Sequence, residues 1–462
     1  MRVVELTHLD APALAAVLNG ELIRPGDGRR AAGVGHDTRT LEAGDLFFAI
    51  RGDRFDGHAF MAAAGARGAA GAVVSDPAAA GALPADRLVV RVADTTAALG
   101  RLAAHMRRTR TGLTVVGVTG SNGKTTSKEL IRAALGRAGP TAHSPGNFNN
   151  HIGVPMSVLG IPSGSRYAVI EMGTEAPGEI APLAAIARPD IAIVTNIGDT
   201  HLLGLGSRDG VAREKGHIYS ALASGGTAVI NLDTGFADHF RTLAPGPVVT
   251  YSMAAAADLT GELAASGPDG IVVRVNGRWD FPCRLPGAHN AANLLGALAV
   301  CRAAGLDPAR FVDAFAGVVL PGMRMERRTA GGITFINDAY NANPQSMRAG
   351  IAFLGGLDAR PGRKIFVCGD MRDLGPGAET LHDAVGRLIT ARTADLLITV
   401  GPLAAAAGRM AAEGTTPPAQ VIACATVAEA RQALAGAVRP GDTVYLKGSR
   451  SVGLEGVLEG RD

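Results

Sequence analysis

A glycine-rich loop at residues 120–126, with the sequence Gly-Ser-Asn-Gly-Lys-Thr-Thr, carries the residue types that hold a phosphate group. The apolar run 113–118 predicts a buried strand before it, and the pattern over 124–135 predicts a helix after it. At such a junction the free backbone N–H groups and the helix dipole face an anion. Lys124 can then reach the β- and γ-phosphates of a nucleotide, and Thr125 can ligate Mg²⁺. The predicted nucleotide-binding residues are Gly120, Ser121, Asn122, Gly123, Lys124, Thr125 and Thr126.

The spacing of this loop differs from that of the common P-loop, whose first glycine would fall at Val118. Gly120, Gly123 and Lys124 form a shorter motif, G-x-x-G-K-T-T. The alternative, a glycine turn with an incidental lysine, is disfavoured by the strand before the loop and the helix after it. The sequence therefore predicts a P-loop-type ATPase that differs from the common P-loop kinases.

Beyond the loop, the chain contains three candidates for metal binding or catalysis. Glu171 closes the apolar strand 167–172, where a carboxylate is costly unless it is paired or bound to a metal, and we interpret it as a Mg²⁺ ligand. His201 follows the strand 191–197, and a structural histidine is the alternative to a ligand there. Lys215 lies on a predicted helix, and its local sequence indicates an ordinary surface lysine.

Two polar clusters point to ligand recognition. The first lies in residues 146–155 and holds Asn147, Asn149 and Asn150. Because each amide needs hydrogen-bond partners, such a segment cannot build a core, and it suggests recognition of a polar substrate; a polar turn is the alternative. The second cluster includes Asp338 and Asn341 and follows a predicted strand, at the position where open α/β sheets bind ligands.

The composition indicates a folded cytoplasmic protein of several domains. With 462 residues the chain is too long for one ordinary core, and its net charge of +3 gives no argument for nucleic acid as a partner. Charged residues within 1–5 argue against a signal peptide, and the lack of an uncharged apolar stretch of about 18 residues argues against a membrane span. The four cysteines lack C-x-x-C spacing, so we expect reduced, mostly buried thiols. We expect a monomer, and we expect the basic run 107–110 to be a solvated helix end.

Strand and helix patterns alternate in three regions, which predicts three α/β domains. Residues 1–92 form an N-terminal domain with strands at 46–50, 72–75 and 88–92. Residues 93–321 hold the phosphate loop and strands at 167–172, 191–197 and 227–232, in a mainly parallel sheet covered on both faces. Residues 322–462 form a Rossmann-like domain with strands at 333–339, 364–369, 395–400, 421–425 and 443–447.

Several longer motifs resemble those of the Mur ligases, the ATP-dependent amide-forming enzymes of peptidoglycan precursor synthesis. Thr119-Gly-Ser-Asn-Gly-Lys-Thr-Thr126 resembles their ATP loop. Three further motifs resemble those of the branch that adds D-alanyl-D-alanine to UDP-N-acetylmuramoyl-tripeptide. They are Gly146-Asn-Phe-Asn-Asn-His-Ile-Gly-Val-Pro155, Asn337-Asp-Ala-Tyr-Asn-Ala-Asn-Pro344 and Lys447-Gly-Ser-Arg450. Three motifs near the N-terminus resemble those of the uridine-nucleotide domain of that branch: Asp37-Thr-Arg-Thr40, Gly44-Asp-Leu-Phe-Phe-Ala-Ile-Arg-Gly52 and Arg54-Phe-Asp-Gly-His58. The match covers nearly the whole chain in the same order.

The resemblance implies a UDP-substrate-binding N-terminal domain, a central ATPase and a C-terminal domain that closes over ATP and helps bind the dipeptide. It implies catalytic roles for Lys124, Lys215 and His201, with Lys215 carbamylated to support a second Mg²⁺ ion. The implied metal-binding positions are Thr125, Glu171, His201 and Lys215. Nucleotide contacts are implied for Asn290 at the adenine and, through domain closure, for Arg324, Asp338 and Asn341. Substrate contacts are implied for Thr38 and Arg39 on the uridine side, and we add Asn147, Asn149 and Asn150 to the expected substrate-binding residues.

The chain departs from the family pattern at three places. Thr174-Glu-Ala176 stands where Asn-His often follows Glu-Met-Gly, Leu203 stands where an acidic residue is common, and His217 stands where a glutamate is common. These departures concern local substrate and metal contacts rather than the reaction.

The expected reaction is the ATP-dependent addition of D-alanyl-D-alanine to UDP-N-acetylmuramoyl-tripeptide through an acyl phosphate, with two Mg²⁺ ions. Two alternatives stay open at this point. One is a related ligase with another acceptor, such as the diaminopimelate-adding enzyme or folylpolyglutamate synthase. The other is an ATP-binding protein that does not ligate. The third residue of the tripeptide, diaminopimelate or lysine, also stays open.

Overall fold

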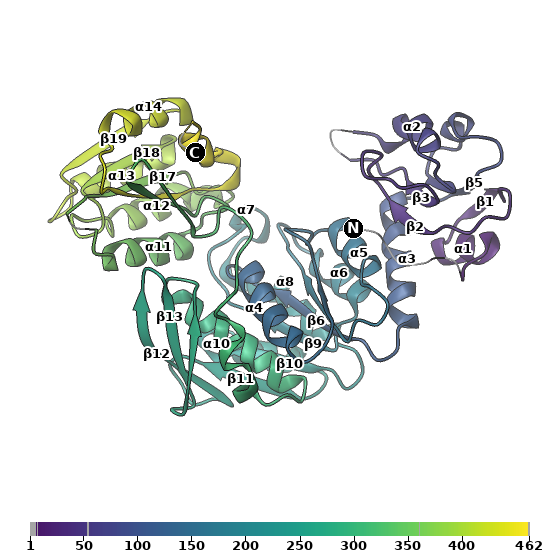
Figure 1. The fold of residues 1–462 in the computed structure, drawn as a ribbon, viewed down its shortest axis with the longest axis horizontal. Coiled ribbons are helices and arrows are strands. Elements are labelled where there is room, and N and C mark those ends of the chain that lie inside the picture. The colour runs from purple at the N-terminus through teal and green to yellow at the C-terminus, as the bar shows by residue number, and fades with distance from the viewer. Residues whose placement is uncertain (1–5, 7, 53–54, 360, 461–462) are drawn as a thin grey trace.

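The computed structural model describes residues 6, 8–52, 55–359 and 361–460. Residues 1–5, on which the expectation about a signal peptide rests, and Arg54 of the N-terminal motif lie outside them. Figure 1 shows three lobes along a curved path, with the N-terminal lobe at one end, the C-terminal lobe at the other and a central lobe between them. Each lobe is built on its own sheet, which confirms the predicted class of three α/β units. The boundaries after residues 92 and 321 remain a proposal.

The N-terminal lobe has a five-stranded sheet in the order β1-β5-β4-β3-β2. Its strands are β1 (Glu21–Arg24), β2 (Gly33–Gly35), β3 (Asp45–Phe48), β4 (Gly71–Val74) and β5 (Leu88–Arg91), and its helices are α1 (Ala11–Leu18) and α2 (Met61–Ala66). The three predicted strands correspond to β3, β4 and β5, which run parallel. The sequence patterns miss β1 and β2, because β2 has only three residues and β1 is an edge strand without buried side chains.

Helix α3 (Thr95–Thr109) leads from the first lobe into the second, and its apolar side chains share one core with both. At the basic C-terminal end of this helix, Arg107 is bound to the central lobe. The Arg107 side chain is 6% exposed and donates hydrogen bonds to the carbonyl oxygens of Ala187 and Arg188 and to the carboxylate of Asp190. The expectation of a solvated helix end is therefore wrong for Arg107, because its guanidinium ties α3 to the central lobe.

The central lobe contains a nine-stranded sheet in the order β14-β13-β12-β11-β10-β9-β6-β8-β7. Its first strands are β6 (Thr114–Thr119), β7 (Thr141–His143), β8 (Tyr167–Glu171), β9 (Ile191–Val194), β10 (Thr227–Asn231) and β11 (Val248–Ser252). Its helices are α4 (Lys124–Gly136), α5 (Gly153–Leu159), α6 (Ile180–Ala187), α7 (Leu202–Leu205), α8 (Arg208–Ser220), α9 (Ala237–Leu243) and α10 (His289–Ala303). Alternate residues of β6 enter opposite cores: Val116 and Val118 lie in the core with α4 and α10, whereas Val115 lies in the core with α3 and α8. The predicted parallel sheet with two covered faces is confirmed for these strands.

An antiparallel extension of this sheet is not predicted by the sequence patterns above. The strands β12 (Leu259–Gly267), β13 (Gly270–Val275) and β14 (Trp279–Cys283) pair antiparallel to one another. Asn276 and Gly277, with φ values of 52° and 65°, turn the chain from β13 into β14. Such a left-handed pair is what a tight hairpin turn requires, so the Asn-Gly dipeptide is the signal that predicts this hairpin.

The C-terminal lobe has a six-stranded sheet in the order β15-β16-β20-β17-β18-β19. Its strands are β15 (Glu326–Ala330), β16 (Ile333–Asn337), β17 (Lys364–Gly369), β18 (Leu396–Val400), β19 (Gln420–Cys424) and β20 (Thr443–Lys447). Its helices are α11 (Pro344–Gly356), α12 (Ala378–Gly386), α13 (Pro402–Ala412) and α14 (Val427–Ala437). The five predicted strands are all present and parallel, and β15 is added antiparallel at one edge.

Two compositional expectations can be compared with this fold. The four cysteines, Cys283, Cys301, Cys368 and Cys424, are free and buried, as expected. Among the helices of the described residues, none combines the length and the apolar character that crossing a bilayer demands.

Candidate active site

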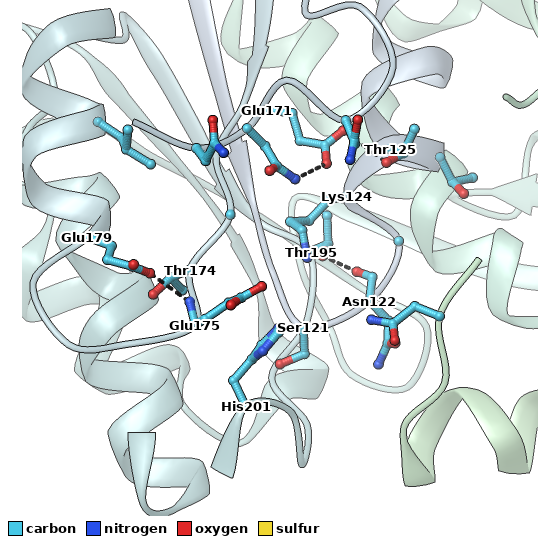
Figure 2. A pocket seen from close by; sticks show the side chains of 18 of the residues that line it. Ser121, Asn122, Lys124, Thr125, Glu171, Thr174, Glu175, Glu179, Thr195 and His201 are labelled. Atoms are coloured by element: carbon cyan, nitrogen blue, oxygen red, sulfur yellow. Dashed lines mark hydrogen bonds between the residues drawn. The ribbon is translucent and has the colours of Figure 1, made fainter. Parts of the chain in front are cut away.

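A cavity of about 1410 Å³ opens at the carboxyl ends of β6, β8 and β9 and extends to α3 and to the C-terminal lobe (Figure 2). The predicted site residues that line it are Ser121, Asn122, Gly123, Lys124, Thr125, Thr126, Asn147, Asn149, Asn150, Glu171, His201, Asn290, Arg324, Asp338 and Asn341. The structure therefore brings three parts of the chain around one space: the nucleotide loop (residues 120–126), the amide loop (residues 146–155) and the C-terminal polar cluster of Asp338 and Asn341. Gly120 and Lys215 are buried and do not line it, and Thr38 and Arg39 lie on the N-terminal lobe outside it.

The loop between β6 and α4 follows a path that only glycine allows at two positions. Gly120 has a φ of 151°, and a Cβ there would lie 1.9 Å from Oγ1 of Thr195. Gly123 has a φ of 74°, and a Cβ there would lie 2.3 Å from Oδ1 of Asn293. The two glycines let the loop pack against Thr195, the residue that follows β9, and against Asn293 of α10, and so fix its shape before any ligand binds.

The backbone N–H groups of this loop are not all available to a phosphate. Those of Ser121 and Asn122 donate to the carbonyl oxygen and to Oδ1 of Asn196, at 3.0 and 2.8 Å. Those of residues 124–126 belong to the first turn of α4, ahead of the bond from the Ser127 N–H group to the Gly123 carbonyl oxygen. A phosphate would therefore be held mainly by the first turn of α4.

Lys124 bends back over the loop, where its Nζ donates to the carbonyl oxygen of Gly120 at 2.9 Å. Burial lowers the pKa of Lys124; nearby Glu171 opposes this shift, and Arg324 adds to it. A phosphate group would supply further negative charge beside this half-buried ammonium.

Glu171, at the end of β8, is 1% exposed and held from two sides. Its Oε2 accepts a hydrogen bond from Oγ1 of Thr125, and its Oε1 accepts one from Nδ2 of Asn149, both at 2.9 Å. The hydroxyl of Thr125 and the carboxylate of Glu171 are the hard oxygen ligands that Mg²⁺ prefers. Among the described residues, no group of three or more His, Cys, Asp or Glu side chains is arranged to hold a metal ion.

His201 begins α7 with a left-handed backbone, at φ 53° and ψ 34°. Burial, together with the charges of Lys124 and Lys215, lowers the pKa of His201 to about 4. Its Nδ1 is buried and has no hydrogen-bond partner among the described residues. A neutral imidazole with an unused nitrogen fits a ligand-binding role.

Lys215 is completely buried, so the local interpretation as a surface lysine is wrong. It shares one face of α8 with Val211, Ile218 and Tyr219, a helical spacing that could have predicted its burial. Its Nζ has no hydrogen-bond partner among the described residues. Burial, and next the charge of Lys124, move the pKa of Lys215 well below its usual value, which favours the neutral amine.

The amide loop owes its shape to its own asparagines. Asn150 accepts hydrogen bonds from the N–H groups of Ile152 and Gly153 and so stabilises the turn that leads into α5. Asn149 contacts Glu171 as described, and its carbonyl oxygen accepts from the N–H group of Gly173. Asn149 therefore connects the loop to the carboxylate, and both asparagines line the cavity.

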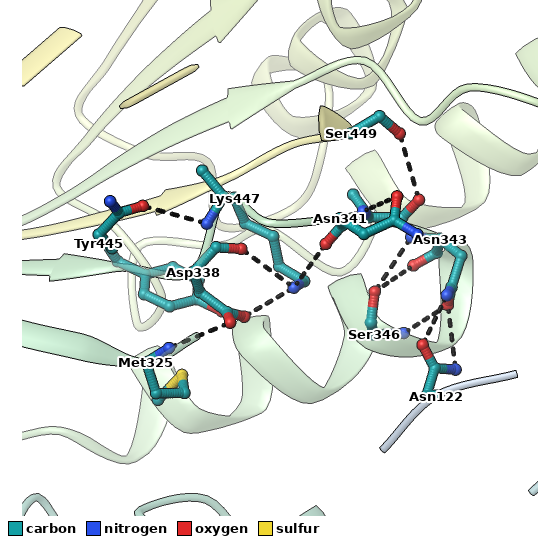
Figure 3. Close-up of polar contacts among 12 residues, drawn as sticks. Asn122, Met325, Asp338, Asn341, Asn343, Ser346, Tyr445, Lys447 and Ser449 are labelled. Atoms are coloured by element: carbon teal, nitrogen blue, oxygen red, sulfur yellow. Dashed lines mark hydrogen bonds and ion pairs between the residues drawn. The ribbon is translucent and has the colours of Figure 1, made fainter. Parts of the chain in front are cut away.

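The C-terminal lobe contacts the nucleotide loop through an amide pair, shown in Figure 3. Asn343, the N-cap of α11, donates from Nδ2 to Oδ1 of Asn122 at 2.6 Å. In return, Nδ2 of Asn122 donates to Oδ1 of Asn343 at 3.3 Å and to Oε1 of Gln345 at 2.9 Å. The Asn122 side chain thus points at α11.

Asp338 and Asn341 lie beside this contact, at the carboxyl end of β16 (Figure 3). The carboxylate of Asp338 accepts hydrogen bonds from Nζ of Lys447 at 2.6 Å and from the hydroxyl of Tyr445 at 2.9 Å. Lys447 also donates to the carbonyl oxygen of Asn341 at 3.2 Å. Lys447 and Tyr445 therefore hold in place the acidic group that faces the cavity.

Arg324 reaches from the linker between the lobes to Thr125, one of the predicted metal-binding residues. Its guanidinium lies 3.5 Å from the ring centroid of Tyr340 and donates to Oγ1 of Thr125 at 3.2 Å. The residues on either side, Met323 and Met325, have left-handed backbones with φ values of 61° and 52°. A strained stretch of linker therefore directs Arg324 at the loop.

The two residues predicted on the uridine side, Thr38 and Arg39, do not line the cavity. Arg39 is exposed and forms an ion pair with Asp37 at 2.6 Å, which holds the pKa of Asp37 at about 2. Thr38 is half-buried beside it. Their substrate role stays a prediction.

Of the three departures from the family pattern, only the first touches the cavity. Thr174 and Glu175 line it, next to His201 (Figure 2). Leu203 is 70% exposed, and its N–H group donates to the carbonyl oxygen of Asp373 in the C-terminal lobe. His217 lies on the exposed face of α8.

Three groups of contacts escape the sequence patterns. Asn196 and Thr195 hold the nucleotide loop, and Gln345 contacts it from the other lobe. Lys128 lies one helical turn beyond Lys124, and that spacing is the available signal for it. The others come from distant segments, which leave no local pattern.

Comparison with known proteins agrees with this geometry. Models of the Mur ligase family match three segments: the catalytic domain at residues 30–107, the middle domain at 118–301 and the glutamate ligase domain at 323–450. The UDP-N-acetylmuramoyl-tripeptide–D-alanyl-D-alanine ligase of Bacillus subtilis is 36% identical over 437 residues, which cover 92% of each chain.

Two solved structures are similar along their whole length. The crystal structure of MurF from Acinetobacter baumannii has a TM-score of 0.86 and 30% identity, and the match covers 97% of both chains. MurF ligase from Thermotoga maritima in complex with ADP has a TM-score of 0.79 and 26% identity, and the match covers 92% of this chain and 96% of that one. The chain therefore belongs to the Mur ligase family, in its UDP-N-acetylmuramoyl-tripeptide–D-alanyl-D-alanine ligase branch.

Proposed function

We propose that this chain uses ATP to join D-alanyl-D-alanine to UDP-N-acetylmuramoyl-tripeptide, and that an acyl phosphate is the intermediate. The observation that carries the proposal is the single cavity around which the nucleotide loop, the buried Glu171, the amide loop and the C-terminal polar cluster meet. The full-length likeness to ligases of that name supports the choice of both substrates.

The carboxylate of the tripeptide must be activated, because its oxygen is a poor leaving group. Transfer of the γ-phosphoryl group of ATP to the carboxylate of the tripeptide breaks the phosphoanhydride bond and yields ADP and an acyl phosphate. Lys124 and the first turn of α4 would stabilise the charge on the phosphates as the group moves. The unprotonated amine of the dipeptide then attacks the acyl carbon, the C–O bond to phosphate breaks, and the nitrogen releases a proton as the amide bond forms.

Thr125 and Glu171 would hold a Mg²⁺ ion, since their oxygens lie 2.9 Å apart at the edge of the cavity. When bound, such an ion offsets the negative charge of the phosphates. We propose a second ion beside a carbamylated Lys215. The neutral amine is the form that adds to CO₂, forming an N–C bond and releasing a proton. The buried Lys215 amine, which has no hydrogen-bond partner in the part of the chain that the structure describes, fits that step. His201, neutral at physiological pH, would assist there.

The C-terminal lobe would exclude water from the acyl phosphate. Arg324, Asp338 and Asn341 are our proposed nucleotide contacts on that side, and Asn290 is the proposed adenine contact. We assign the amide loop, with Thr38 and Arg39, to the UDP-linked substrate. Because the reaction draws on ATP and a UDP-linked precursor, we propose that it takes place in the cytoplasm.

Phosphate release tests the proposal. We expect release only when ATP, UDP-N-acetylmuramoyl-tripeptide and D-alanyl-D-alanine are all present. Release without the dipeptide would contradict a ligase and favour a nucleotide-hydrolysing binding protein, and release with diaminopimelate or glutamate as acceptor would favour a related ligase. Parallel assays with the lysine and diaminopimelate tripeptides would identify the third residue.

A further inference from the structure

Lys128 is a second lysine under the nucleotide loop, and it does not line the cavity. Its side chain is fully buried on α4, one turn beyond Lys124. Its Nζ donates to the carbonyl oxygens of Ser144 and Gly146, at 2.8 and 2.9 Å. A buried ammonium costs several kcal/mol unless it is compensated, and these two carbonyl oxygens supply part of the compensation.

The surroundings of Lys128 lead directly to the proposed metal ligand. Its Nζ lies 3.7 Å from Oε2 of Glu171 and 3.3 Å from Oε1 of Glu129. Ser144, whose carbonyl oxygen Lys128 binds, also accepts a hydrogen bond from the N–H group of Glu171 at 3.1 Å. A single ammonium therefore contacts the carboxylate and the segment that anchors its backbone.

The same ammonium fixes the start of the amide loop. Its two carbonyl contacts, at Ser144 and Gly146, bracket the entry into residues 147–150. Asn149 of that loop completes the hold on Glu171 from the side of Oε1. Lys128, Asn149 and Thr125 thus restrain the carboxylate from three directions.

We propose that Lys128 is a positioning residue: it pre-organises Glu171 and the amide loop for a nucleotide bound with Mg²⁺. The inference rests on the proposed function in so far as that function places the ion at Glu171. The positioning role of Lys128 differs from a purely structural role. A purely structural residue would affect folding without changing how nucleotide binding depends on the metal.

Arg107 provides a matched control. It is also a buried cation that binds two carbonyl oxygens and a carboxylate. Its partner Asp190 accepts from the N–H group of Val115, at the start of β6 and β9, whereas the nucleotide loop lies at their carboxyl ends. Arg107→Met should therefore reduce stability without affecting the metal.

The experiment compares Lys128→Met with Arg107→Met by calorimetry of ADP binding, with Mg²⁺ and with EDTA. Loss of a group that orients a metal ligand lowers metal affinity by about 10- to 100-fold. We expect Lys128→Met to weaken ADP binding at least about tenfold in Mg²⁺ and by less than about twofold in EDTA, and Arg107→Met to change neither. This readout needs neither peptide substrate, so failure of the ligase assay and failure of this inference are distinguishable.

Hydrogen exchange of the metal-free protein adds a second readout. Residues 144–150 should exchange faster in Lys128→Met and at the wild-type rate in Arg107→Met. A folded Lys128→Met protein with wild-type metal dependence of ADP binding would overturn the proposal. If that variant does not fold, Lys128→Gln, which keeps a hydrogen-bond donor without the charge, is measured by the same criterion. Failure of both to fold would make Lys128 a folding residue and would also overturn it.

Discussion

Replacing Asn343 by serine isolates the contact between the nucleotide loop and α11. Serine is about as good an N-cap as asparagine, so the bond to the N–H group of Ser346 can be kept. The shorter side chain cannot reach Asn122, and two hydrogen bonds, of 2.6 and 3.3 Å, are lost. At about 1 kcal/mol net for a good bond and less for the longer one, docking of the C-terminal lobe weakens by about 1–2 kcal/mol, or about 5- to 30-fold.

We expect kcat/KM for ATP to fall by about that factor in Asn343→Ser, measured by phosphate release with both other substrates saturating. Thermal unfolding should barely change. Asn343→Ala is the comparison, since it loses the cap as well and should cost about 1 kcal/mol of stability on top of the same kinetic loss. Wild-type kcat/KM in the serine variant, or a kinetic loss confined to the alanine variant, would refute a role for the amide pair in docking.

Two further predictions concern the buried groups near the cavity. Lys215→Ala should remove most of the activity, with partial rescue by short carboxylates in solution, and ¹³C-bicarbonate should give a carbamate signal in the wild type alone; full activity of the variant would exclude the carbamate. For His201, the folded-state pKa of about 4 lies below the ordinary 6.5, so the unfolded chain binds the proton first and stability declines as the pH falls from 6.5 toward 4. In urea unfolding at pH 7 and pH 5, His201→Gln should therefore show a smaller loss of stability than the wild type, and an equal loss would count against this titration.

The sequence predicts best what depends on neighbouring residues. The strand, loop and helix around Lys124 and the strand that ends at Glu171 are visible because hydrophobic runs and glycines are local signals. The Asn276-Gly277 hairpin is equally local, and a search for turn dipeptides could have found it.

Other parts of the site depend on how distant segments pack. The bond between Asn122 and Asn343 spans more than two hundred residues, and only docking of two lobes creates it. The burial of Lys215 is an intermediate case. The apolar residues of α8 reveal the face, but the absence of a partner for its amine among the described residues follows only from the packed structure.

The left-handed methionines beside Arg324 have a consequence for nucleotide binding. A non-glycine residue in that conformation costs about 1–2 kcal/mol, and here the N–H groups of Met323 and Met325 are held by the carboxylates of Glu326 and Asp338. The linker therefore carries a conformational cost that these two carboxylates offset. One of them, Asp338, is also a proposed nucleotide contact. A nucleotide that draws the Asp338 carboxylate away from Met325 would weaken this support, so binding at that carboxylate and the conformation of the linker are coupled.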